Sequence, residues 1–167
     1  PMPKSEARRL LNVAEANVVL YVGRIEPLKG LELLLSAVAL LGDVAHTRLI
    51  IVGGKPAEDT ELQRLKALAE RLGIGDSTTF TGAVGQEDLR KYYSASDVFV
   101  LPSYYESFGL AALEAMACGT PVVVSRVGGL SSFVEEGRTG YLIPWRCPEP
   151  FAERIRTLLA NPDLREA

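Results

Sequence analysis

Cysteine and histidine are scarce in this chain of 167 residues, which holds two cysteines and one histidine. Cys118 and Cys147 stand far apart, at no spacing typical of a metal site or a redox pair, so we expect idle thiols in a reducing compartment. His46 is expected to be structural. Because the sequence has neither a histidine cluster nor an Asp-x-Asp pair, it indicates no metal site.

Long hydrophobic runs and an excess of one charge are also missing. The longest apolar run, residues 33–41, is too short to span a bilayer, and the first residues lack the layout of a signal peptide. The net charge of −3 gives no reason to expect nucleic acid or an anionic membrane as a partner. We therefore expect a cytoplasmic domain without membrane association.

Several motifs of nucleotide and hydrolase chemistry are absent as well. No Gly-x-Gly-x-x-Gly lies between a strand and a helix, which disfavours the usual dinucleotide-binding fingerprint. There is no phosphate-binding Gly-Lys-Ser/Thr loop and no Gly-x-Ser-x-Gly nucleophile elbow. The sequence thus predicts neither a bound cofactor nor a serine hydrolase.

What is present suits one globular domain. Apolar residues make up 47% and charged residues 23% of a chain long enough for one substantial core. Residues 1–16 carry no clear core signal and are interpreted as a leader or linker. The domain itself is expected to span residues 17–167.

Short runs of unbroken apolar residues are typical of strands covered on both faces, as in a parallel sheet. They lie at 18–23, 48–54, 97–103 and 121–125, and weaker strands are predicted at 78–82 and 140–144. Apolar residues at helical spacing predict helices over 30–42, 60–73, 86–96, 108–119 and 149–161. The alternation predicts an α/β fold, a Rossmann-like open parallel sheet with helices on both faces.

In such sheets, ligands bind beyond the carboxyl ends of the strands, next to helix N-termini. Arg24 and Lys29 follow the first strand, and a guanidinium with an ammonium suits a diphosphate. Ordinary solvated charges are the alternative. The pair Gly128 and Gly129 follows the strand at 121–125, either as a turn that approaches a phosphate or as a simple strand end.

The stretch PSYYESFGLAALEAMACGTP, residues 102–121, places a carboxylate where none is expected. Leu110, Leu113 and Ala117 fall on one helical stripe that we expect to face the core, and Glu114 falls on the same stripe. A buried carboxylate needs partners. The partners are either a pair of ligand hydroxyls or an internal cation such as Arg24.

Other residues of this stretch surround the start of the same helix. Gly109 lets the backbone approach a ligand, and Glu106 lies just outside the helix start. Glu106 either contacts a ligand or is simply an anion near a helix N-terminus. Tyr104, Tyr105 and Phe108 flank the pocket mouth, as ligand contacts or as packing.

Three motifs in order resemble a known family. They are VGRIEPLKG (22–30), the Glu-x7-Glu element ESFGLAALE (106–114) and EAMACGTPVVVS (114–125). Together they resemble the C-terminal, donor-binding half of the family 4 retaining glycosyltransferases, and the similarity runs from residue 18 to residue 164. The resemblance implies a GT-B fold, in which two Rossmann-like domains face each other across a cleft.

The resemblance also implies roles for the candidate residues. Arg24 and Lys29 would bind the diphosphate of a nucleotide-sugar and stabilise the charge of the leaving group without a metal. Glu106 would contact the transferred sugar near the reacting carbon and stabilise its positive charge. Backbone N–H groups would be offered to the sugar and phosphates by Phe108, Gly109 and Leu110.

For the nucleoside, the resemblance implies that Glu114 holds the ribose hydroxyls, which would answer why a carboxylate lies on that stripe. The strand at 78–82 and Val84 would line the base site. The motifs most resemble the branch with sucrose-phosphate synthases and mycothiol-pathway N-acetylglucosaminyltransferases. The favoured donor is therefore a UDP-sugar.

The sequence departs from the family pattern at two places, and it covers only one of the two domains of that fold. Ser131 and Ser132 replace a common Pro-Glu, and WRCPEP (145–150) is unusual where an Asp-containing turn is frequent. The acceptor-binding N-terminal domain is absent, so we expect a monomer that binds donor but is inactive alone. The alternatives are half of a nucleotide-sugar epimerase and a non-catalytic sugar-nucleotide-binding module.

Overall fold

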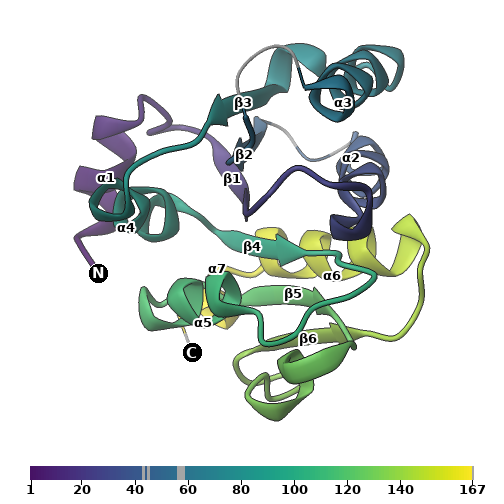
Figure 1. Cartoon of the computed structure of the whole chain (residues 1–167). Coiled ribbons are helices and arrows are strands. Elements are labelled where there is room, and N and C mark those ends of the chain that lie inside the picture. The colour runs from purple at the N-terminus through teal and green to yellow at the C-terminus, as the bar shows by residue number, and fades with distance from the viewer. Residues whose placement is uncertain (43, 45, 56–58, 167) are drawn as a thin grey trace.

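All six expected strands form one parallel sheet in the computed structural model of the chain, which describes residues 1–42, 44, 46–55 and 59–166 (Figure 1). The sheet has the order β3-β2-β1-β4-β5-β6. Its strands are β1 (Asn17–Val22), β2 (Thr47–Val52), β3 (Thr78–Gly82), β4 (Val98–Leu101), β5 (Val122–Ser125) and β6 (Gly140–Ile143). Every neighbouring pair is parallel.

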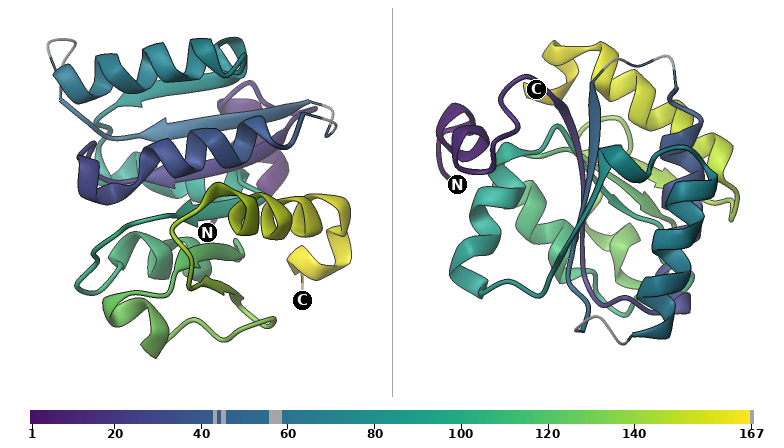
Figure 2. Two further views of the ribbon diagram at one scale, coloured as in Figure 1. Left: turned by 90° about the vertical axis from the view of Figure 1, so that its right-hand side faces the viewer. Right: turned by 90° about the horizontal axis from the view of Figure 1, so that it is seen from above.

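Helices cover both faces of this sheet. Figure 2 shows α2 (Leu31–Ala39), α3 (Thr60–Arg71) and α6 (Pro148–Ala160) on one face. The other face carries α4 (Gln86–Ala95) and α5 (Leu110–Ala117), and α1 (Lys4–Leu10) packs against α4. The last helix of the described residues is α7 (Pro162–Glu166), and short 3-10 turns occupy Pro27–Lys29, Gly75–Ser77 and Gly128–Ser132.

The central strands are buried because both faces are covered. Every residue of β4 and β5 is buried, as are five of the six in β1. Unbroken apolar runs are what such strands require. The predicted fold class is therefore confirmed, and the common Rossmann strand order forms here without a Gly-x-Gly-x-x-Gly turn. Within the residues that the structure describes, no helix is long and apolar enough to cross a membrane.

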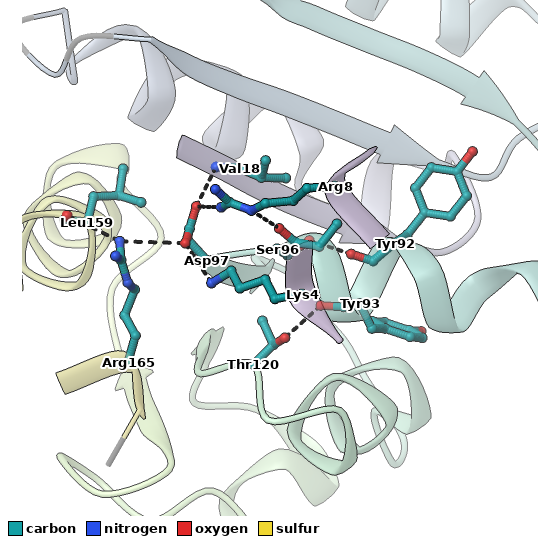
Figure 3. Close-up of polar contacts among 11 residues, drawn as sticks. Lys4, Arg8, Val18, Tyr92, Tyr93, Ser96, Asp97, Thr120, Leu159 and Arg165 are labelled. Atoms are coloured by element: carbon teal, nitrogen blue, oxygen red, sulfur yellow. Dashed lines mark hydrogen bonds and ion pairs between the residues drawn. The ribbon is translucent and has the colours of Figure 1, made fainter. Parts of the chain in front are cut away.

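Asp97, the residue directly before β4, ties the N-terminal segment to the sheet (Figure 3). Its buried carboxylate accepts hydrogen bonds from Lys4 Nζ at 2.8 Å, from an Arg8 guanidinium nitrogen, and from the backbone N–H of Val18 at 2.8 Å. Arg165 Nη1 of α7 lies 3.6 Å away. One carboxylate therefore joins α1, β1, β4 and α7.

Residues 1–16 thus differ from the expected leader, because they include α1, whose Ala7 is fully buried. The helix carries no clear apolar pattern because Ala7 is its only buried residue, and the charged Lys4 and Arg8 provide its contacts with Asp97. Arg8 Nε also donates to the backbone carbonyl of Ala95 on α4, at 3.0 Å. Whether the domain begins at residue 17 stays a prediction.

Asp97 gives stability a defined pH dependence. Burial alone raises the pKa of this carboxyl group, but the hydrogen bonds of Lys4 and Val18 and the charges of Lys4 and Arg8 outweigh burial and hold the pKa below its ordinary value. Because the pKa is lower in the folded than in the unfolded chain, the stabilisation is complete above the ordinary pKa of about 3.9 and is lost as the pH falls through the folded-state pKa.

We predict that Asp97→Asn lowers the free energy of unfolding by about 3 kcal/mol at pH 7, because Lys4, Arg8 and Arg165 then lose the buried carboxylate that they share. Urea denaturation measures the loss. The variant should also lose stability less steeply than the parent chain below pH 4. Asp76→Asn, at an exposed aspartate, is the matched control and should change little. An equal acid dependence in parent and Asp97→Asn would contradict the assignment.

Candidate functional site

The candidate residues gather where β1 and β4 lie side by side. The chain leaves β1 toward α2 on one face and leaves β4 toward α5 on the other, so the carboxyl ends of these two strands form the topological switch point of the sheet. Such a switch point opens a crevice in a parallel sheet. Arg24 and Lys29 lie in the loop after β1, and Glu106 lies in the loop after β4.

Lys29 and Glu106 form an ion pair across this switch point. Lys29 Nζ lies 2.8 Å from Glu106 Oε2, and each side chain is only 14% exposed. Ser103 Oγ donates to the same carboxylate oxygen at 3.3 Å. The structure therefore brings together two of the expected site residues from distant parts of the sequence.

The backbones of the two loops fit closely beside this pair. The N–H of Tyr104 donates to the carbonyl of Leu28 at 2.8 Å. Gly30 has φ +66°, and a Cβ built at this position would lie 2.2 Å from the carbonyl oxygen of Pro102. Only glycine satisfies both the left-handed conformation and the contact. Gly30 therefore fixes how near Lys29 comes to the loop of Glu106.

Arg24 has a different environment. Its side chain is 75% exposed and pairs with Glu26, with Nη1 and Oε1 3.1 Å apart. Its backbone carbonyl accepts a hydrogen bond from Tyr21 Oη at 2.6 Å. Burial first, and then the charges of Glu106 and Glu26, raises the pKa of Tyr21, so this phenol stays a donor. The loop backbone at Arg24 is anchored while its guanidinium faces solvent.

The start of α5 directly follows the loop that carries Glu106. The helix begins at Leu110, with Gly109 as N-cap, and the first N–H groups of a helix have no intrahelical acceptor. Phe108 is half exposed, and its ring lies 5.7 Å from that of Phe133. The expected backbone donors at Phe108, Gly109 and Leu110 thus lie at the helix start, two to four residues after Glu106.

The two glycines after β5 pack against this loop. A Cβ at Gly128, which has φ +51°, would lie 1.6 Å from the carbonyl oxygen of Glu106. The N–H of Gly129 donates to the carbonyl of Ser107 at 3.0 Å. The glycine pair therefore supports the backbone around Glu106, which is a third explanation beside a phosphate turn and a strand end.

The expected core stripe of α5 is wrong. Leu110 is 60% and Leu113 37% exposed, whereas the buried residues of the helix are Ala112 and Ala115. The helix is apolar on nearly every side, so spacing alone could not identify the face that packs on β4 and β5. Small alanines occupy this face because they let the helix lie close to the sheet.

Glu114 is half-buried and finds its partners on α4. Tyr93 Oη donates to Glu114 Oε2 at 2.7 Å, and Gln86 Nε2 donates to Oε1 at 3.2 Å. Arg24, the internal cation weighed from the sequence, pairs with Glu26 instead. The sequence does not predict Tyr93 and Gln86 as partners of Glu114, because a contact between two helices is not visible in the residue spacing of either helix.

A pocket of about 440 Å³ opens at the carboxyl ends of β1 and β2, beside the loop that follows β3. Val84 lines it, as expected for a base site, while the expected strand at 78–82 contributes only the loop that it leads into. The other lining residues are Val22, Gly23, Arg24, Ile25, Glu26, Val52, Gly53, Gly54, Lys55, Asp59, Ala83 and Leu89. The pocket is chiefly apolar, with charged groups at its rim.

The remaining candidates are ordinary in their surroundings. Tyr104 Oη donates to Glu32 Oε1 at 3.0 Å, and Tyr105 is exposed. Cys118 and Cys147 are free and half-buried, and His46 is exposed. Among the described residues, no group of three or more His, Cys, Asp or Glu could hold a metal ion. That the reaction needs no metal stays a prediction.

Comparison with known proteins gives one consistent family. The sequence pattern of the family described as "Glycosyl transferases group 1" matches residues 4–167. A D-inositol 3-phosphate glycosyltransferase of Geodermatophilus obscurus is 47% identical over 174 aligned positions, which cover 100% of this chain and 39% of the relative. One from Acidothermus cellulolyticus is 42% identical, with 99% and 38% covered.

Solved structures agree in fold. A sucrose-phosphate synthase from Thermosynechococcus elongatus superposes with a TM-score of 0.90 at 42% identity, covering 98% of this chain and 41% of that one. HepE from Anabaena in complex with UDP gives a TM-score of 0.88 at 30% identity, with 98% and 44% covered. The chain thus spans about two fifths of the length of the relatives it matches.

The close fit at Gly30 has a measurable consequence. We predict that Gly30→Ala is more destabilising than Gly73→Ala, which changes another glycine of positive φ (+75°) where a Cβ would meet nothing within 4 Å. Gly73→Ala should cost about 1–2 kcal/mol for the left-handed conformation, and Gly30→Ala about 1–3 kcal/mol more for the collision with Pro102. Urea denaturation gives both values. Equal losses would contradict the close approach.

Proposed function

The chain belongs to the glycosyl transferases of group 1, and on this premise we propose that it binds the nucleotide-sugar donor of a retaining hexosyltransferase, with a UDP-sugar as the favoured donor. The observation that carries the proposal is the part-buried Lys29–Glu106 pair at the switch point, beside the N-terminus of α5 and an apolar pocket. The cation and the oriented N–H groups suit the negative charge of the departing diphosphate, and the carboxylate suits the positive charge that develops on the sugar.

The diphosphate lies, in this proposal, between Arg24, Lys29 and the start of α5. Departure of the nucleoside diphosphate builds negative charge on the phosphate oxygens. Lys29 Nζ has three N–H donors, of which Glu106 takes one, so two are left for phosphate oxygens. The exposed Arg24 guanidinium can swing onto the phosphates, and the N–H groups at Phe108, Gly109 and Leu110 add donors at the positive end of the helix.

Glu106 lies nearest the sugar. Cleavage of the glycosyl–phosphate bond leaves positive charge on the sugar ring, and a carboxylate close to the reacting carbon stabilises it. Lys29 and Ser103 hold this carboxylate in one orientation before any donor binds. A group that needs no reorganisation during the reaction stabilises the transition state most effectively.

The nucleoside lies toward β2 and β3. Glu114 would accept from the ribose hydroxyls, and the pocket lined by Val84 would hold the base against apolar walls. The UDP preference is supported by the HepE structures, which contain UDP or UDP-glucose. A site that is apolar with a few polar groups at its rim is typical of small-molecule recognition.

We predict that UDP raises the melting temperature of the chain more than GDP or ADP does, by an amount that grows with ligand excess; 100-fold excess over Kd corresponds to about 2.7 kcal/mol. Arg24→Ala and Lys29→Ala should each remove the shift, because a charge-assisted hydrogen bond to phosphate contributes about 1.5–3 kcal/mol. Thermal-shift titration measures this.

Arg71→Ala is the matched control for this experiment. Arg71 lies at the C-terminal end of α3, and α3 begins at the carboxyl edge of the sheet, so the residue is at the opposite edge from the site. Its loss should leave the UDP shift intact. No shift with any nucleoside diphosphate or its sugars would overturn the proposed function.

The acceptor side of the reaction belongs, in this proposal, to a second domain of a longer protein, as in relatives more than twice the length of this chain. We predict that the 167-residue chain binds UDP-sugar but transfers no sugar. A product assay with radiolabelled UDP-glucose and a panel of inositol phosphate and sugar phosphate acceptors tests this. Sustained sugar transfer by the isolated chain would contradict the proposal that a second domain is needed to bind the acceptor.

A further inference from the structure

Tyr93 of α4 contacts the carboxylate that the proposed function assigns to ribose. Its Oη donates to Glu114 Oε2 at 2.7 Å, while Gln86 Nε2 reaches Oε1 at 3.2 Å. Gln86 is exposed at the first turn of α4, whereas Tyr93 is only 2% exposed. The phenol is therefore the better-fixed of the two donors.

Tyr93 is itself held by two further contacts. Its ring packs against Phe99 of β4, with ring centroids 5.9 Å apart and planes tilted by 58°. Its backbone carbonyl accepts a hydrogen bond from the buried Thr120 Oγ1 at 2.7 Å, between α5 and β5 (Figure 3). A side chain fixed by a ring contact and a backbone bond places its hydroxyl at one point on the border between α4 and α5.

The phenol can only donate to Glu114. Burial first, and then the hydrogen bond to Glu114 and its charge, raises the pKa of Tyr93, so the hydroxyl keeps its proton at neutral pH. A carboxylate offers about four lone-pair positions on its two oxygens. The phenol and Gln86 occupy two of these, and two are left, which is the number that a ribose diol needs.

We propose that Tyr93 is a positioning residue for donor binding: its hydroxyl fixes the Glu114 carboxylate in the orientation in which the unused lone pairs accept from the 2′- and 3′-hydroxyls of the ribose. The inference rests on the proposed function, which assigns the ribose to Glu114. Site side chains locked by a supporting hydrogen bond bind with less loss of freedom.

The test uses Tyr93→Phe, which keeps the ring against Phe99 and the backbone bond to Thr120 and removes only the hydroxyl. Isothermal titration calorimetry gives Kd for UDP and for 2′,3′-dideoxy-UDP. The parent chain should prefer UDP by about tenfold or more. In Tyr93→Phe the ratio of Kd for 2′,3′-dideoxy-UDP to Kd for UDP should fall by about five- to tenfold, while Kd for the dideoxy ligand stays nearly unchanged.

Tyr92→Phe, one residue earlier and half-buried, is the matched control and should keep the full preference for UDP. A merely structural role for Tyr93 would lower the melting temperature and weaken both ligands alike, with the preference retained; that result overturns the inference. Absence of UDP binding by the parent chain is a different outcome, which overturns the proposed function instead.

A double variant keeps the inference testable if Tyr93→Phe folds poorly. In Glu114→Gln/Tyr93→Phe no carboxylate charge is left without its partner. Loss of the phenol hydroxyl should therefore lower the free energy of unfolding less than it does in Tyr93→Phe. Its preference for UDP over the dideoxy ligand should equal that of Glu114→Gln alone. A further drop in the double variant would show that Tyr93 acts on the ligand by another route, contrary to the inference.

Discussion

The contact between β1 and β4 is the constraint on which the rest of the molecule depends. These two strands are the centre of the sheet, and the chain leaves them toward opposite faces. Charged side chains join them at both ends: Asp97, the residue before β4, accepts from the N–H of Val18 at the amino ends, and Lys29 pairs with Glu106 beyond the carboxyl ends. One junction holds the terminal helices, and the other forms the candidate site.

The two junctions differ in what they leave unsatisfied. Asp97 accepts hydrogen bonds from Lys4, Arg8 and the N–H of Val18, and Arg165 of α7 adds a third positive charge, so the protein itself supplies the partners of this carboxylate. Lys29 keeps two N–H donors beyond its bond to Glu106, and the first N–H groups of α5 have no intrahelical acceptor. An anion is therefore favoured at the carboxyl ends of these strands, where the proposed function places the diphosphate.

Much of this architecture could be predicted from the sequence, because burial on both faces leaves unbroken apolar runs and ligand sites in such sheets follow the strands. The positions of Lys29 and Glu106 after two neighbouring strands agree with the ion pair that they form, while their role in binding stays a prediction. Helix α1 was missed because only Ala7 enters the core. The predicted buried face of α5 is wrong because leucine is more hydrophobic than alanine, so a hydrophobic pattern favours the face with leucines. Close packing on the sheet instead buries the small side chains of Ala112 and Ala115.

The partners of Glu114 could not be predicted for a related reason. Tyr93 and Glu114 stand on two helices that the fold places side by side, and neither helix shows from its own spacing which residue faces the other. The exposed Leu113 follows from the same rotation of α5: once alanines pack on β4 and β5, Glu114 turns toward α4 rather than into the core. The packing of two small alanines thus decides which groups are left to meet a ligand.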